Sequence, residues 1–157
     1  MIEIKKTGDN MLVLSSYKKE IVFDTEKNTI VLDGFDVNFP GEYEKGGILL
    51  EVKTYKEILF YNFKVDKKNI TVIPTDKFEI SEEILKFLDN VEVLIIKGTK
   101  DAAKTFENIE AKVVVPYGEL KSTFFTALGQ NPEEISVYKI KGELSGDNTE
   151  YINLQED

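Results

Sequence analysis

The chain contains no histidine, no cysteine, no arginine and no tryptophan. Losing histidine removes the commonest zinc ligand and the only side chain whose unperturbed pKa lies near neutrality. Losing cysteine excludes disulfides, iron–sulfur clusters, thiolate zinc sites and cysteine nucleophiles. The sequence therefore lacks the ordinary routes to metal-dependent hydrolysis and to acid–base catalysis, and the serines have no histidine base to activate them.

Positive charge is also scarce and is carried only by lysine. Twenty lysines stand against 29 acidic residues, which gives a formal net charge of −9. Nucleic-acid backbones are held by clustered Lys and Arg, so we expect no nucleic-acid partner. The excess of negative charge is explained most simply by an acidic surface that aids solubility. The alternative is that it binds a basic protein partner.

Long apolar runs are missing as well. No stretch approaches the roughly 20 residues that a membrane helix requires. Residues 1–16 are interrupted by Lys5, Lys6 and Asp9 and do not resemble a secretory signal. We expect a cytoplasmic protein without a membrane span, folded as one domain over residues 1–157.

The first half of the chain has the pattern of an antiparallel sheet. Polar turns of hairpin length separate short apolar runs, and hairpins join antiparallel neighbours. The predicted strands are residues 2–4, 11–14, 21–23, 30–32, 48–52, 58–65 and 70–73.

After Pro74 the apolar period changes from that of strands to that of helices. A first helix over residues 80–88 has Ser81 as its cap, and helices over 102–109 and 120–128 follow. Strands over 91–96 and 113–115 alternate with them, and residues 136–140 and 151–154 are expected to close the sheet. The whole predicts a mixed α/β (α+β) fold.

Several segments resemble small bacterial and archaeal metallo-β-lactamase-fold hydrolases. Residues 39–48, Phe-Pro-Gly-Glu-Tyr-Glu-Lys-Gly-Gly-Ile, are similar to the family's Gly-Pro-Gly-Glu-Tyr-Glu segment. Thr75 and Asp76, with residues 80–83, resemble its Gly-Asp turn and the following helix, and residues 91–96 and 111–116 resemble its next strands. The resemblance implies a shortened metallo-β-lactamase-like sandwich, with antiparallel strands first and strand–helix alternation after them.

The sequence departs from this family at its metal ligands. Tyr117-Gly118-Glu119 stands where the family places a histidine after the strand, and Asp9 replaces a histidine in the first turn. The interval from Asp24 to Pro40 lacks the His-x-His-x-Asp-His segment altogether. Only the bridging aspartate remains, as Asp76, and one carboxylate does not hold a catalytic zinc. We therefore expect a degenerate member with no catalytic residues and no cofactor.

Carboxylates are the remaining candidates for chemistry. Oxygen ligands suit Mg²⁺ or Mn²⁺, and the acids considered are Asp24, Asp33, Asp36, Glu42, Glu44 and Asp76. Asp76 also fits a simple turn residue. For the Gly-Glu-Tyr-Glu segment, a tight turn at Pro40 and Gly41 with Tyr43 entering the core is favoured over a cleft that contains the two glutamates.

Three hypotheses remain. The first is a non-catalytic binding or assembly module, with Glu42, Glu44 and Asp24 as candidate binding residues and with a protein partner or self-association, such as a homodimer. The alternative is a metal-dependent hydrolase with a carboxylate-bound Mg²⁺ or Mn²⁺ around Asp76. The third is a phage or mobile-element protein that uses the scaffold to block another protein.

Overall fold

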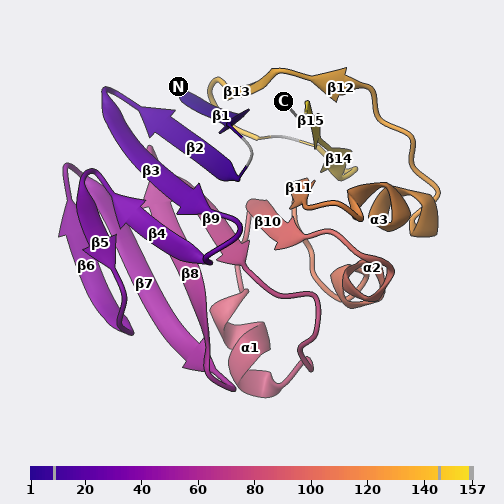
Figure 1. Ribbon diagram of the computed structural model, residues 1–157, viewed down its shortest axis with the longest axis horizontal. Coiled ribbons are helices and arrows are strands. Elements are labelled where there is room, and N and C mark those ends of the chain that lie inside the picture. Colours follow the sequence, from indigo (N-terminus) through magenta and orange to yellow (C-terminus); the bar gives the residue numbers. More distant parts are fainter. Residues whose placement is uncertain (9, 145, 156–157) are drawn as a thin grey trace.

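The computed structural model describes residues 1–8, 10–144 and 146–155. Six strands form a wholly antiparallel sheet, here called sheet A, in the order β13-β1-β2-β3-β4-β5 (Figure 1). They are β1 (Ile2–Thr7), β2 (Met11–Ser16), β3 (Lys19–Asp24), β4 (Thr29–Leu32), β5 (Phe35–Val37) and β13 (Val137–Ile140).

Sheet B has seven strands in the order β14-β11-β10-β9-β8-β7-β6. Strands β6 to β9 are antiparallel neighbours, whereas β9, β10, β11 and β14 run parallel. Two short strands, β12 (Glu134–Ile135) and β15 (Asn153–Leu154), form a separate parallel pair. The strands of sheet B are β6 (Gly41–Lys45), β7 (Ile48–Tyr55), β8 (Ile58–Val65), β9 (Lys68–Ile73), β10 (Val93–Lys97), β11 (Val113–Tyr117) and β14 (Glu150–Tyr151).

Tight turns connect the antiparallel strands. At Tyr17 and Lys18 two consecutive residues have positive φ, 48° and 68°, and the Gly46–Gly47 turn repeats this with 61° and 84°. Two positive φ values in succession mark a turn whose twist matches that of the flanking strands. The first of these turns is only two residues long, so Lys19 already belongs to β3.

Three helices of six or seven residues lie on one side of sheet B: α1 (Glu82–Phe87), α2 (Lys100–Phe106) and α3 (Lys121–Ala127). The Ser81 hydroxyl caps α1 as predicted, by accepting the Ile84 N–H at 3.2 Å. Thr99 caps α2 in the same way at 3.1 Å, which the sequence prediction missed. No helix within the described residues is long and apolar enough to cross a membrane.

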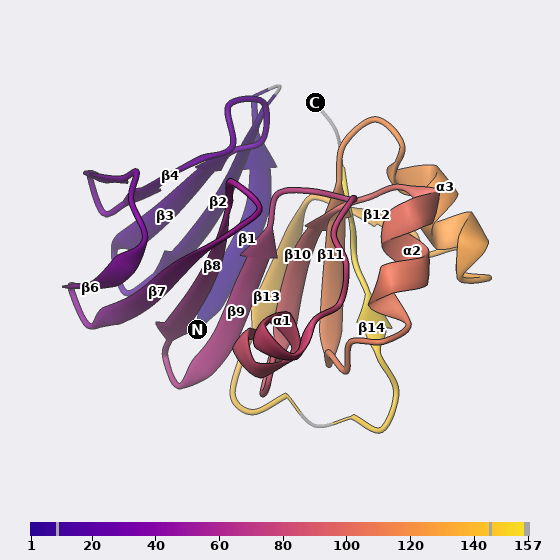
Figure 2. The same ribbon diagram turned by 90° about the horizontal axis from the view of Figure 1, so that it is seen from below.

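Two hydrophobic cores lie on the two faces of sheet B. The first fills the space between the sheets and contains Phe23 of sheet A together with Tyr61 and Val72 of sheet B. The second lies between sheet B and the helices and contains Phe60 and Phe124. Figure 2 shows this layering, with the helices on the side of sheet B that faces away from sheet A. The mixed α/β prediction is confirmed, although the fold is richer in strand than in helix.

One prediction about the strands is wrong. Residues 25–39 were expected to hold a single strand, and Pro40–Gly41 a turn. Instead Phe35–Val37 is the edge strand β5. Phe39 and Pro40 do lie in a bend, but Gly41 already begins the edge strand β6 (Gly41–Lys45). Tyr43 is half-buried and packs against the border of the inter-sheet core. The prediction failed because an edge strand buries little, so its sequence carries a weak apolar pattern.

Candidate functional site

The parallel strands β9, β10 and β11 all end at the same edge of sheet B. In α/β folds the crevice beyond the carboxyl ends of parallel strands is the usual ligand site. Across the sandwich this edge faces the end of β3, because the Phe23 ring contacts Tyr117 at the end of β11, and Figure 2 shows sheet A beside these strands. We call this end of the sandwich the mouth.

Two aromatic rings fill the space beneath the mouth. Tyr117, the last residue of β11, meets Phe23 of β3 with ring centroids 5.3 Å apart and planes at 82°. Both side chains are buried, and among the described residues the Tyr117 hydroxyl has no hydrogen-bond partner. Burial raises the pKa of this hydroxyl, and the negative charge of Asp76 adds to the shift. The group therefore stays protonated and neutral at physiological pH.

Lysines contribute positive charge to the mouth. Lys121, at the start of α3, is half-buried, and its Nζ donates to the Leu154 carbonyl at 2.5 Å. Burial lowers the pKa of Lys121, the charge of Glu134 opposes this shift and that of Lys6 adds to it. Lys6 reaches the same region because it alternates with Ile2 and Ile4 on the core-facing side of β1.

Asp24 stabilises a turn through its side chain, and Asp76 lies in a bend. Asp76 is half-buried after β9, and beside it the Thr75 hydroxyl accepts the Lys77 N–H at 3.1 Å. Asp24 lies at the end of β3, where its Oδ1 accepts the N–H groups of Glu26 and Lys27 at 3.0 and 2.9 Å. Such side-chain-to-backbone bonds stabilise tight turns.

The two glutamates lie elsewhere. Glu42 and Glu44 are exposed on β6, the last strand of sheet B, and Glu44 Oε1 accepts the Gly47 N–H at 3.2 Å. Of the other acids considered, Asp33 pairs with Lys19 at 3.5 Å, and Asp36 is exposed on β5. Asp9, which the family resemblance aligned with a histidine, lies outside the described residues.

These positions do not make a metal centre. Within residues 1–8, 10–144 and 146–155, no group of three or more His, Cys, Asp or Glu residues is arranged to hold a metal ion. Of the described side chains at the mouth, Tyr117 is neutral and Asp24 is engaged in its own turn, so they do not offer zinc or Mg²⁺ a set of three ligands. The donor set therefore gives no support to a carboxylate-bound metal around Asp76.

A cavity of about 890 Å³ opens at the opposite edge of sheet B, beside the starts of β10 and β11. Its acids include Glu92, whose Oε1 accepts the Asn69 N–H at 3.1 Å and whose Oε2 lies 4.0 Å from Lys112 Nζ. These contacts tie strands together. None of the sequence-predicted candidates lines this cavity.

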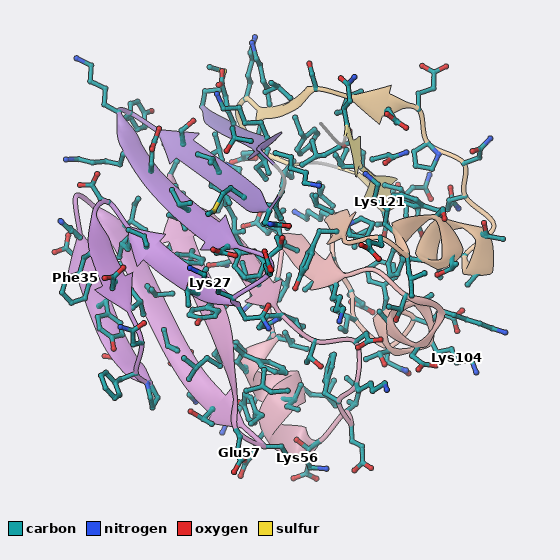
Figure 3. All side chains as sticks on the ribbon, in the orientation of Figure 1. Lys27, Phe35, Lys56, Glu57, Lys104 and Lys121 are labelled. Carbon is teal, nitrogen blue, oxygen red and sulfur yellow. The ribbon has the colours of Figure 1, made fainter. Side chains whose placement is uncertain are left out.

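An exposed aromatic cluster was missed by the sequence prediction. Phe35 of β5 lies 6.1 Å from Tyr43 of β6 between ring centroids, and the Tyr43 hydroxyl donates to the Phe39 carbonyl at 2.5 Å. Phe35 is 49% exposed and Phe39 is 73% exposed. We call Phe35, Phe39 and Tyr43 the aromatic edge. Figure 3 places Phe35 on the opposite side of the molecule from Lys121.

Comparison with known proteins shows the fold. No family model matches the sequence, and no curated protein matches it. Among solved structures, this chain is similar to a Thermotoga maritima protein described as a candidate Zn-dependent hydrolase of the metallo-β-lactamase superfamily, with a TM-score of 0.74 and 13% identity.

The alignment with that protein covers 98% of this chain and 99% of the other. Since both chains align over nearly their whole lengths, the predicted loss of a segment stays a prediction. At 13% identity the likeness speaks to the fold and not to the chemistry. The chain has a metallo-β-lactamase-like fold.

Proposed function

We propose that this chain is a protein-binding module that uses a metallo-β-lactamase-like scaffold without zinc chemistry. The aromatic edge carries the proposal, because it presents three aromatic side chains where an edge strand of each sheet ends the sandwich. Aromatic residues are enriched in protein interfaces, since they bury a large area with little loss of conformational freedom.

The mouth supports binding over hydrolysis. A catalytic zinc takes about three protein ligands and an open position. Here Tyr117 stands where the resembled family places a ligand, and its ring packs against Phe23. Lys6 and Lys121 add positive charge to this end of the sandwich, where each acts on the other.

Hydrogen bonds hold the segments of the aromatic edge together. The Tyr43 hydroxyl holds the Phe39 carbonyl, and Lys45 Nζ donates to the Asp33 carbonyl at 2.6 Å, which ties β6 to the β4–β5 turn. Partners bind more tightly to a surface that is already ordered, because less conformational entropy is lost on association. This arrangement supports the protein-partner prediction made from the sequence.

Peptide selection tests the proposal. A phage library of random nine-residue peptides is selected on the wild-type protein and on Phe35→Ser/Phe39→Ser. A matched double variant, Leu85→Ser/Leu120→Ser, removes two other exposed side chains, 46% and 55% exposed, outside the aromatic edge. We expect peptides that bind the wild type and the leucine variant but bind the phenylalanine variant roughly tenfold more weakly.

The proposal fails if no peptide is enriched, or if the enriched peptides bind both double variants equally.

A metal-binding experiment tests the alternative, the metal-dependent hydrolase. The protein is incubated with Zn²⁺, Mn²⁺ and Mg²⁺, desalted and analysed by mass spectrometry. Retention near one ion per chain, with hydrolysis that is lost in Asp76→Ala, would replace the binding module by a hydrolase. Sedimentation velocity over a range of concentrations tests the homodimer.

A further inference from the structure

We infer that the partner segment is an extended, basic chain that adds to β6 as a further strand of sheet B. The inference rests on the proposed function and names the chemistry of the partner. Among the residues that the structure describes, strand β6 is the end of the seven-stranded sheet and pairs with β7 alone, from Gly41 opposite Val52 to Lys45 opposite Ile48. An edge strand presents alternate N–H and C=O groups to solvent, where another strand can pair.

The two faces of β6 differ in chemistry. Tyr43 points toward the inter-sheet core and contacts the Phe35 ring. Glu42 and Glu44 are exposed and, by strand alternation, lie on the opposite face. The edge therefore offers an aromatic surface on one side of the strand and two carboxylates on the other.

Two grooves lie beside the carboxylate-bearing face of β6. Glu42 lies opposite Glu51 of β7, and both line a groove of about 340 Å³ together with Leu49 and Lys64. A second groove of about 630 Å³ runs from Glu51 to Glu83 on α1. Both grooves border the side of β6 that carries the carboxylates. They also contain Lys64, Lys53 and Lys86, so the excess of negative charge lies on β6 itself, at Glu42 and Glu44.

This geometry predicts a recognition pattern. Residues directly opposite each other in paired strands point to the same face of the sheet. The two partner residues opposite Glu42 and Glu44 therefore lie beside carboxylates, and the residue between them faces Tyr43 and Phe35. A partner strand with a basic, an apolar and a basic residue in succession therefore complements Glu42, Tyr43 and Glu44.

A second copy of this chain is a poor occupant of the same edge. Two-fold pairing of β6 with β6 about Tyr43 brings Glu42 against Glu44 twice. Two-fold pairing about Glu44 brings two Glu44 carboxylates together. Like charges directly opposite each other destabilise a strand pair, and a net charge of −9 on each copy adds long-range repulsion. The carboxylates that oppose self-pairing are those that attract a basic strand.

The probe is a labelled synthetic peptide, Thr-Lys-Val-Lys-Val-Lys-Thr, whose binding is measured by fluorescence anisotropy. Comparison peptides carry glutamate in place of lysine, or carry N-methyl groups on two adjacent central residues, which block hydrogen bonding along both edges of the peptide strand.

The protein variants are Glu42→Lys/Glu44→Lys and the matched Glu107→Lys/Glu119→Lys. Both change net charge equally, and the second pair is exposed and lies outside β6. Circular dichroism verifies folding, and Glu42→Gln/Glu44→Gln serves as a milder variant.

We expect the lysine peptide to bind the wild type and Glu107→Lys/Glu119→Lys alike, and to bind Glu42→Lys/Glu44→Lys roughly tenfold more weakly. Added salt weakens binding, because the contributing charges are exposed. Hydrogen exchange of residues 41–45 slows when the lysine peptide binds, and the glutamate and N-methyl peptides do not bind.

Equal weakening by the two double variants, or binding of the N-methyl peptide as tight as that of its parent, would overturn the inference. So would absence of lysine-peptide binding while selected peptides still require Phe35 and Phe39. In that last case the proposed function stands and only the basic-strand partner fails. Selected peptides that ignore Phe35 and Phe39 reject the proposed function itself.

Discussion

Replacing Tyr117 by phenylalanine is expected to stabilise the protein. The Tyr117 side chain is 6% exposed, and among the described residues its hydroxyl has no hydrogen-bond partner. A buried hydroxyl without a partner costs about 1–3 kcal/mol relative to water. Phenylalanine keeps the ring and its edge-on contact with Phe23. We expect the free energy of unfolding to rise by about 1 kcal/mol.

Tyr138→Phe is the matched control, because it removes the same atom from a side chain that is 8% exposed. The Tyr138 hydroxyl donates to Glu150 Oε2 at 3.0 Å. A hydrogen bond to a charged group contributes about 1.5–3 kcal/mol, so this variant is expected to lower the free energy of unfolding by about 1–2 kcal/mol. The same chemical change, loss of a tyrosine hydroxyl, should therefore raise the free energy of unfolding in Tyr117→Phe and lower it in Tyr138→Phe.

Urea unfolding followed by circular dichroism measures both variants. The midpoint should move up for Tyr117→Phe and down for Tyr138→Phe, at an unchanged dependence on denaturant. A loss of stability in Tyr117→Phe comparable to that in Tyr138→Phe would refute the reasoning. It would mean that the hydroxyl at the mouth is hydrogen-bonded in solution.

Three further predictions concern packing, capping and pH. Gly98→Ala should lower the unfolding free energy by about 1–3 kcal/mol, because a Cβ there would lie 2.9 Å from the Cα of Lys121 and the Cβ of Pro116; an unchanged melting temperature would contradict that contact. Thr99→Ala should lower it by about 1 kcal/mol through loss of the α2 cap, whereas Thr99→Ser should retain most of the stability. Burial raises the pKa of Tyr61 from its ordinary 10.0 to about 12. Between these values the folded state binds more protons than the unfolded state, so stability is full below pH 10 and falls as pH rises toward 12. Tyr61→Phe should flatten that fall, and identical alkaline unfolding curves for the two proteins would count against it.

The antiparallel first half and the three helices were predictable because they depend on local patterns. Apolar runs between turn residues mark strands, and Ser81 with the apolar spacing after it marks a helix. The edge strands β5 and β6 were missed for the converse reason. Their residues are mostly exposed, and their conformation is set by pairing with neighbours along the sheet.

The candidate sites were less predictable than the strands. The sequence shows which residues carry carboxylates, but it could not say which of them lie close together. The structure leaves Asp24 in its own turn and Glu42 on a distant edge, and brings Phe23 onto Tyr117 from far along the chain. Such contacts depend on how sheets stack, and no local pattern encodes that stacking.

Composition by itself determined that this chain has no imidazole or thiolate to offer a metal, because a missing side chain is missing in any fold. Only the tertiary structure decided where the remaining groups gather. It collects lysine charge at the mouth and places Phe35 beside Tyr43 at the open edge of the sandwich. Which side chains come together depends on packing between elements that are distant in sequence. The aromatic edge could therefore be recognised only from the arrangement of the two sheets.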